Sequence, residues 1–189
     1  MRGIRVIAGS ERGRRLVVPP GDSVRPTKDI VRESMFNALD SRRRLVDAAV
    51  LDLFAGTGAL GIEALSRGAA SAVFVERDRN AISAIETNLD TLGLADRGRV
   101  VRSDVGAVLG GALPRETPFD VVLIDPPYDC GDEEIATVLR ALRGPGWLAE
   151  DAMVSVERRT KPRSDVPDDV VIEWERAFGD TLVRFLKLM

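Results

Sequence analysis

Glycines and a carboxylate that could bind a nucleotide cofactor lie together in one short stretch of the chain. Residues 52–61 read DLFAGTGALG, and Gly56, Gly58 and Gly61 match the G-x-G-x-x-G pattern of a dinucleotide site. Glycines at such a place allow a tight turn from a strand into a helix and a close approach of the backbone to a ligand. The motif predicts a nucleotide-type cofactor but does not say which one.

Acidic residues at the ends of three predicted strands narrow this choice. Asp52 precedes the loop, where a carboxylate repels a pyrophosphate but suits the amine and the sulfonium of a methionine moiety. Glu76 follows about 20 residues later and can accept both ribose hydroxyls of either cofactor. Asp104 can accept from the exocyclic amine of adenine, although capping of the following helix is an alternative role for it.

The sequence DPPY, residues 125–128, ends the fourth predicted strand. Two prolines make a stiff turn that lacks backbone donors, so the Asp125 and Pro126 carbonyl oxygens are expected to point outward as acceptors. Two fixed acceptors would orient the amine of a base toward an incoming methyl group, and Tyr128 offers a face on which the base can stack. This motif favours methylation of an amino group over hydride transfer.

Metal chemistry and membrane insertion are both disfavoured by the composition. The chain of 189 residues has no histidine and one cysteine, Cys130, which excludes an internal disulfide framework and argues against zinc. Cys130 is interpreted as incidental, and the acidic residues around it as favourable charge at a helix start: Asp129, Asp132, Glu133 and Glu134. No apolar stretch approaches the ~20 residues of a membrane helix, and the start lacks a signal-peptide block. We expect a cytoplasmic monomer without a membrane partner or a metal.

Positive charge is concentrated at the beginning of the chain. The net charge is −3, but residues 1–45 hold eleven Arg or Lys against five Asp or Glu, and the remainder is acidic. Such a split favours a basic face for a polyanion such as RNA. The alternative is compositional bias, because arginine outnumbers lysine 24 to 3 throughout the chain.

Strand and helix patterns alternate along most of the sequence and predict an α/β fold. Runs 4–8 and 14–18 predict a β-hairpin around 9–13, and a helix with apolar residues from Ile30 to Leu39 follows Thr27. Fully apolar strands separated by helices indicate a parallel sheet that is covered on both faces. The elements expected after this helix are strands at 49–55, 71–76, 99–103 and 119–125, helices at 58–68, 78–92, 104–113 and 132–144, a strand at 153–158 and an antiparallel hairpin over 169–188. About seven strands are expected.

These motifs together resemble a known family. DLFAGTGALGIEALSRGA, VFVERD, RSDV and VVLIDPPY resemble the Rossmann-like class I fold of S-adenosylmethionine-dependent methyltransferases. The opening RVIAGSERGRRLVVPPG and the string RPTKDIVRESMFNAL are similar to the RsmD family, which methylates the N2 amine of a guanine in bacterial 16S ribosomal RNA. The resemblance covers essentially the whole chain. It implies an enzyme that uses S-adenosylmethionine, with ribosomal RNA, free or within a small subunit, as its partner.

The resemblance also implies site residues and domain limits. Residues 1–26 would be a basic hairpin and linker that contact RNA, and residues 27–189 the methyltransferase domain. The implied cofactor residues are Asp52, Phe54, Gly56, Thr57, Gly58, Gly61, Glu76, Asp104, Val105, Arg25 and Thr27. The implied catalytic residues are Asp125, Pro126 and Tyr128, and the implied RNA-binding residues are Arg2, Arg5, Arg12, Arg14 and Arg15.

Three alternative functions remain open from the sequence. An amino-methyltransferase could act instead on adenine N6 in DNA or RNA or on glutamine in a protein, although no gap between motifs is long enough for the target-recognition insert of a DNA enzyme. A nicotinamide-dependent oxidoreductase would lack a substrate domain and leaves DPPY unexplained. A non-catalytic ribosome assembly factor would not need the intact acceptors of DPPY.

Overall fold

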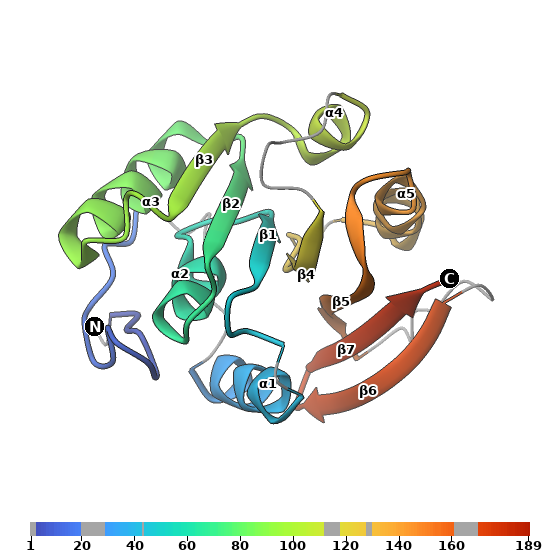
Figure 1. Ribbon diagram of the computed structural model, residues 1–189, viewed down its shortest axis with the longest axis horizontal. Coiled ribbons are helices and arrows are strands. Elements are labelled where there is room, and N and C mark those ends of the chain that lie inside the picture. The colour runs from blue at the N-terminus through green and yellow to red at the C-terminus, as the bar shows by residue number, and fades with distance from the viewer. Residues whose placement is uncertain (1–2, 20–28, 43, 112–117, 128–129, 161–169) are drawn as a thin grey trace.

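The protein was analysed as a computed structural model, which describes residues 3–19, 29–42, 44–111, 118–127, 130–160 and 170–189. Helices and strands alternate from α1 to α5 and are followed by the last strands of the chain (Figure 1). Their bounds are α1 Asp29–Ser41, β1 Ala49–Leu53, α2 Ala59–Ser66, β2 Ser71–Glu76, α3 Arg79–Leu92, β3 Gly98–Arg102, α4 Val105–Leu109, β4 Phe119–Ile124, α5 Asp132–Leu142, β5 Leu148–Arg159, β6 Val170–Phe178 and β7 Thr181–Leu188. In these residues no helix is both long and apolar enough to cross a membrane.

All seven strands of the described chain form one sheet in the order β3-β2-β1-β4-β5-β7-β6. The first five pair in parallel, and β7 pairs antiparallel with both β5 and β6. The predicted mixed sheet with an antiparallel terminal hairpin is therefore confirmed. The order reverses between β1 and β4, which is where open α/β sheets bind their ligands.

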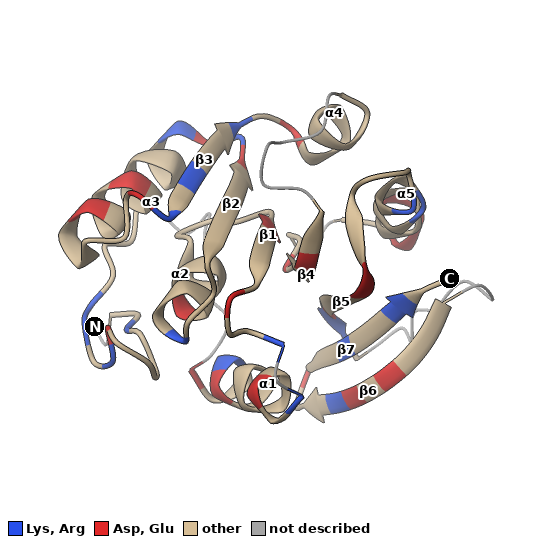
Figure 2. Cartoon of the chain, in the orientation of Figure 1, with Lys and Arg blue, Asp and Glu red and all other residues tan. Residues whose placement is uncertain are grey.

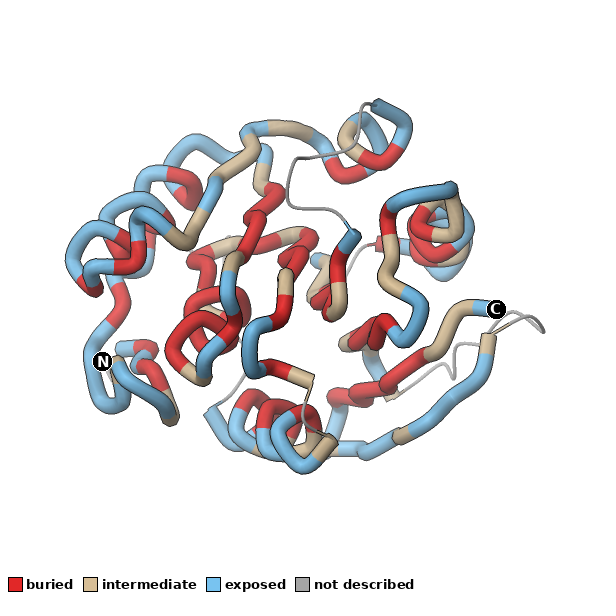
Figure 3. Tube along the Cα trace, viewed as in Figure 1, coloured by how far each residue is buried: buried red, intermediate tan, exposed pale blue. Residues whose placement is uncertain are grey.

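Helices cover both faces of the sheet, as the fully apolar strands require. On one face α1, α2 and α3 pack on a cluster that includes Phe36, Phe74 and Phe185, all with an exposed fraction of 0%. On the other face α4 and α5 pack on a second cluster around Phe119 and Leu142. Figure 3 shows the buried chain concentrated in the strands and in the inward sides of these helices.

Helix ends carry the signals that the sequence suggests. The Asp78 carboxylate accepts from the backbone N–H groups of Asn80 and Ala81 and so caps α3, which ends at Gly93 in the left-handed conformation. Asp104 caps α4 by accepting from the Gly106 N–H at 2.9 Å. Helix α4 stops at Leu109, earlier than the apolar pattern predicts, with Gly110 as its C-cap.

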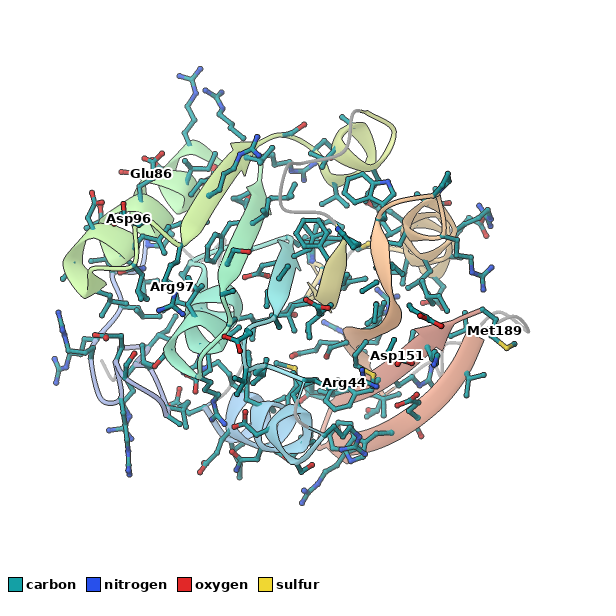
Figure 4. All side chains as sticks on the ribbon, in the orientation of Figure 1. Arg44, Glu86, Asp96, Arg97, Asp151 and Met189 are labelled. Carbon is teal, nitrogen blue, oxygen red and sulfur yellow. The ribbon has the colours of Figure 1, made fainter. Side chains whose placement is uncertain are left out.

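Ionic and polar contacts of long side chains join elements at the amino-terminal edge of the sheet. Arg44 Nη1 donates to the Asp151 carbonyl at 2.7 Å, and the two residues lie close together in Figure 4. The Asp151 carboxylate in turn pairs with Lys187 at 2.8 Å, and this hydrogen bond lowers the pKa of Asp151. The segment before β1 is thereby fastened to β5 and β7.

The predicted N-terminal hairpin is not formed as a pair of strands. One isolated antiparallel bridge joins Arg5 and Arg15, although the apolar side chains of Ile4, Val6 and Leu16 are buried in the first cluster. Three backbone hydrogen bonds cross between the two arms, from Leu16 N–H to the Ile4 carbonyl, from Val6 N–H to the Arg14 carbonyl and from Gly13 N–H to the Val6 carbonyl, each at 2.9 Å. The outer side of the first arm and the turn bond to α2 instead: the N–H groups of Ile7 and Ala8 donate to Glu63, and those of Ser10 and Glu11 to Ser66. We call residues 3–19 the N-terminal segment.

Helix α1 was predicted correctly in place, and Val31, Met35 and Leu39 of its predicted face are buried, but the buried face is shifted toward Arg32 and Phe36. Ile30, expected among its apolar contacts, is 66% exposed, while Arg32 is 1% exposed. The Arg32 Nη2 group donates to the Arg5 carbonyl at 2.5 Å and to Asp29 at 2.9 Å. Periodicity alone misses this because a buried guanidinium with partners replaces an apolar residue.

Gly61 is required by packing, and this gives a first prediction. A Cβ at this position would lie 2.3 Å from Phe74 Cε1, and the Phe74 ring is fully buried between strand and helix. Gly61→Ala is therefore expected to lower the free energy of unfolding by roughly 1–3 kcal/mol through overpacking. Urea unfolding followed by circular dichroism measures this. Gly3→Ala, where a Cβ also meets nothing within 4 Å, is the control and should be neutral; equal stabilities of the two variants would contradict the assignment.

Candidate functional site

The candidate site lies at the carboxyl ends of the central strands. Leu53 pairs with Val75 of β2 on one side and with Ile124 of β4 on the other. The loop that begins at Phe54, the acidic residue Glu76 and the DPPY motif therefore leave the sheet at the same edge. The order of the strands brings together three of the segments that the sequence singled out.

Left-handed backbone shapes the loop between β1 and α2. Gly56 and Gly58 have φ angles of 55° and 75°, and Phe54 has 62°, which is uncommon for a residue with a side chain. The Gly58 N–H donates to the Ala55 carbonyl at 2.7 Å. The tight turn predicted from the glycine pattern is thus formed by Gly56 and Gly58, whereas Gly61 serves the contact of α2 with β2.

Asp52 is a buried carboxylate in which one of the two oxygen atoms has no hydrogen-bond partner. Its Oδ2 atom accepts from the Gly61 N–H at 2.8 Å, while Oδ1 has no partner and the residue is 1% exposed. Burial raises the pKa of Asp52 well above its ordinary value, and the charges of Asp125 and Glu76 raise it further. A cation at the loop would oppose this shift by favouring the charged carboxylate.

Glu76 holds the loop as well as facing the site edge. Its Oε2 atom accepts from the Gly56 N–H at 2.8 Å, and its Oε1 atom accepts from the N–H groups of Arg77 and Asp78 at 2.7 and 2.8 Å. A carboxylate offers about four acceptor positions, so three are already used by the backbone. The ribose contact expected for Glu76 stays a prediction, and it would use the remaining capacity.

The adenine-side residues follow β3. Asp104 caps α4, as the alternative interpretation stated, and its carboxylate lies 3.8 Å from Arg77 Nη1. Its side chain is 59% exposed, so the capping role leaves part of the carboxylate open to solvent. Val105 begins α4 and is 5% exposed. A contact of either residue with adenine stays a prediction.

The described part of the DPPY motif ends β4 beside the loop. Asp125 and Pro126 are half-buried and Pro127 is exposed. The Pro127 carbonyl accepts from the Cys130 N–H at 3.0 Å, which closes a turn around the end of the motif. Arg158 of β5 supports this turn, because its guanidinium donates to the Cys130 carbonyl at 2.9 Å and to the Asp132 carboxylate.

Several predicted site residues cannot be placed or are only partly as expected. Tyr128, Asp129, Arg2, Arg25 and Thr27 lie outside the described residues. Arg5, Arg12, Arg14 and Arg15 are exposed on the N-terminal segment, blue in Figure 2. Arg14 is already engaged, since its Nη2 group donates to the Thr91 carbonyl at 2.8 Å.

Two buried polar residues were missed by the sequence analysis. Glu63 of α2 is 0% exposed and accepts from the N–H groups of Ile7 and Ala8 and from Arg67 Nε. Asn88 of α3 is 2% exposed and contacts both the N-terminal segment and Thr57 in the loop between β1 and α2. Each interrupts the apolar face of its helix, which is the signal that could have identified it.

The electrostatics of the edge fit a cationic ligand better than a pyrophosphate. Acidic residues mark the ends of β1 and β2 and the start of α4 (Figure 2). The uncompensated Oδ1 of Asp52 lies under the loop, where a pyrophosphate would meet repulsion. In the described ranges no group of three or more His, Cys, Asp or Glu is arranged to hold a metal ion.

The strand order, the glycine loop and the motif after β4 define an α/β methyltransferase fold. The family described as "Conserved hypothetical protein 95" matches residues 4–187. The chain is 45% identical to ribosomal RNA small subunit methyltransferase D of Escherichia coli over 96% of this chain and 88% of the relative, and 35% identical to the Haemophilus influenzae protein of that name over 93% and 89%. The solved structure of Escherichia coli yhhF is 40% identical, with a TM-score of 0.84 over 98% of this chain and 97% of that one. The chain belongs to the RsmD family.

The shifted pKa of Asp52 predicts a pH-dependent stability difference. Because the folded state favours the protonated form, stability is lost as pH rises from the ordinary aspartate pKa, about 3.9, toward the raised value. Asp52→Asn removes this loss, so the difference in melting temperature in favour of the variant should increase as the pH rises above about 4. Asp96→Asn on the exposed surface is the control and should show no such trend. A pH-independent difference for Asp52→Asn would argue that burial does not shift this carboxyl.

Proposed function

We propose that the protein transfers a methyl group from S-adenosylmethionine to the exocyclic N2 amine of a guanine in 16S ribosomal RNA. The observation that carries this proposal is the pairing of Leu53 with Ile124, after which the glycine loop and DPPY begin side by side. A cofactor in the loop and a base at DPPY would then be neighbours. The names of the relatives, which specify ribosomal RNA of the small subunit, support the substrate class.

The residues around the loop suit S-adenosylmethionine. This cofactor supplies a methyl group activated by an adjacent sulfonium. Asp52 and the surrounding carboxylates would favour its positive charges, Gly56 and Gly58 would let the backbone approach its methionine part, and Glu76 would accept from its ribose. Asp104 and Val105 stand where the adenine would lie, beyond the end of β3.

Orientation of the target amine is the work that the chain itself must do. The Asp125 carboxylate and the Pro126 carbonyl would each accept one hydrogen bond from the amine, so that the lone pair of the amine points toward the methyl group. Once methylated, the amine is a strong acid, and an ordinary carboxylate or water suffices to remove its proton. The reacting base has to leave its stack to reach this edge, and Tyr128 is assigned to receive it.

The N-terminal segment is assigned to RNA binding. Its exposed arginines lie on one fold-back of the chain that is held against α2 by hydrogen bonds to Glu63 and Ser66. Contacts of this kind go mainly to phosphates and position the RNA without reading its sequence. We expect the protein to act on RNA in the cytoplasm, as a monomer, with residues 1–26 forming the RNA contact.

Substitution of Asp125 tests the catalytic assignment. Asp125→Ala removes one of two acceptors for the amine and should lower the rate of methyl transfer about 10²-fold or more, the scale of a missing catalytic hydrogen bond. Affinity for S-adenosylmethionine and for RNA should change little. The assay is transfer of labelled methyl to unmodified 16S RNA under single-turnover conditions, with Asp96→Ala on the exposed surface as the control.

The isosteric variant separates orientation from proton removal. Asp125→Asn still offers an oxygen acceptor but is no longer a base, so it should retain much more activity than Asp125→Ala if orientation dominates. Equal loss of activity in both variants would show that the charge or basicity of the carboxylate is needed. Full activity of Asp125→Ala would refute the assignment of DPPY as the catalytic motif.

Removal of Arg12 and Arg15 tests the RNA-binding assignment. Both side chains are exposed on the N-terminal segment, and replacing both with Ala should weaken RNA binding. The slope of log K against log salt should flatten by roughly 0.7–0.9 for each phosphate that the protein no longer neutralises. Filter binding across a salt series measures this slope, and Arg140→Ala on α5 is the control. An unchanged slope in the double variant would exclude these two side chains from the RNA interface.

A further inference from the structure

Asn88 makes three hydrogen bonds to two separate segments of the protein. Its Oδ1 atom accepts from the Val17 N–H at 2.6 Å, and its Nδ2 group donates to the Val17 carbonyl at 3.1 Å. The same Nδ2 group donates to the Thr57 carbonyl at 3.2 Å. Two carbonyls require the amide nitrogen and one N–H requires the oxygen, so the orientation of the carboxamide is determined by its partners.

The contact with Val17 reproduces what a neighbouring strand would provide. Both backbone polar groups of Val17 are paired with one side chain, although the Val17 side chain itself is 48% exposed. The amide of Asn88 thus fastens the end of the N-terminal segment to α3. Because Asn88 is 2% exposed, water cannot readily replace these bonds, and their removal would leave buried polar groups unsatisfied.

The contact with Thr57 reaches the centre of the loop between β1 and α2, to which the cofactor is assigned and which we call the cofactor loop. Thr57 is 3% exposed and lies between Gly56 and Gly58, both of which have left-handed backbone. The Glu76 carboxylate holds one side of this loop through the Gly56 N–H. Asn88 holds the other side through the Thr57 carbonyl, so a change in the loop is transmitted to the carboxamide.

Other docking contacts of the N-terminal segment do not share this property. Glu63 and Ser66 bind residues 7–11 to α2, and Arg32 binds the Arg5 carbonyl to α1. Each of these contacts joins the N-terminal segment to a helix and does not include the loop between β1 and α2. Asn88 differs because one amide group bonds the segment and the loop together.

We infer that Asn88 is a positioning residue that couples the cofactor loop to the N-terminal segment, so that binding of the cofactor and binding of RNA strengthen each other. The inference rests on the proposed function, in which the loop binds S-adenosylmethionine and the segment binds RNA. A ligand that orders either partner of Asn88 also orders the carboxamide, and the second ligand then meets a partly ordered site. By linkage, the factor by which RNA tightens cofactor binding equals the factor for the reverse effect.

The test measures this factor with S-adenosylhomocysteine, the demethylated product, and 16S RNA transcribed in vitro. Equilibrium dialysis gives the dissociation constant of S-adenosylhomocysteine with and without saturating RNA. In the wild-type protein RNA should tighten binding by about 5-fold or more, the lower end of common allosteric couplings. Asn88→Asp keeps the acceptor for Val17 but places a carboxylate against two carbonyls, so the ratio should fall to about 1.

Asn37→Asp is the matched control, because it makes the same chemical change on an exposed position of α1. Its ratio should equal that of the wild type. A merely structural role of Asn88 would not lower the ratio: irreversibly unfolded protein reduces only the number of sites, and reversible unfolding would raise the ratio because RNA then stabilises the folded state. An Asn88→Asp ratio equal to that of the wild type, or no coupling in the wild type, overturns the inference while the proposed function stands.

A second measurement covers the case in which Asn88→Asp does not fold. Val17→Pro removes the N–H that donates to Asn88 and leaves α3 and the loop untouched, and it should abolish the coupling in the same way. In the wild type, S-adenosylhomocysteine without RNA should also slow hydrogen exchange of the Val17 amide, and an unchanged exchange rate would contradict the inference. Failure of the wild type to bind S-adenosylhomocysteine at all would overturn the proposed function, and the inference with it.

Discussion

The buried hydrogen bond between the Asp52 carboxylate and the Gly61 N–H is the interaction on which the site depends. It joins the end of β1 to the first turn of α2 and forces the intervening loop into its left-handed turn. Helix α2 can come this close only because Gly61 has no side chain to meet Phe74. The same bond places a carboxylate in the interior beside Asp125 and Glu76, where burial and like charge make ionisation unfavourable. A cationic ligand at the loop would relieve this unfavourable electrostatic energy.

Buried polar side chains, rather than a sheet edge, connect the basic segment to this site. Glu63, Ser66 and Asn88 bond backbone N–H groups of the segment that point away from its own fold-back or lie in its turn. Each belongs to α2 or α3, the two helices that flank the cofactor loop. The segment thus shares its support with the loop. An arrangement of this kind gives directional contacts at fixed places, whereas apolar burial of Ile4, Val6 and Leu16 alone would allow sliding.

The sequence was sufficient for the sheet and the location of the site because both are encoded locally. Apolar runs such as Phe119–Ile124 can only be buried strands, and the glycine loop and DPPY are contiguous motifs at strand ends. The predicted pair of N-terminal strands is not seen, because the chain folds back through a single bridge and is held by Glu63 and Ser66, which lie more than 50 residues away in the sequence. For the same reason Arg32, Arg158 and Asn88 could not be assigned: their roles come from tertiary partners. Periodicity reports the burial of a face but not the pairing of a polar residue within it.

The position of β7 between β5 and β6 has a consequence for biosynthesis. Strand β5 gains its second neighbour only from residues 181–188, which follow every other strand in the sequence. A nascent chain that has completed β1 to β5 consequently presents β5 as an open, unpaired edge. Arg158 of β5 supports the turn after DPPY by donating to the Cys130 carbonyl. Until β7 has formed, Arg158 would lack its neighbour in the sheet, Leu182. The edge to which the target base is assigned would therefore gain its full support only after residues 181–188 have left the ribosome.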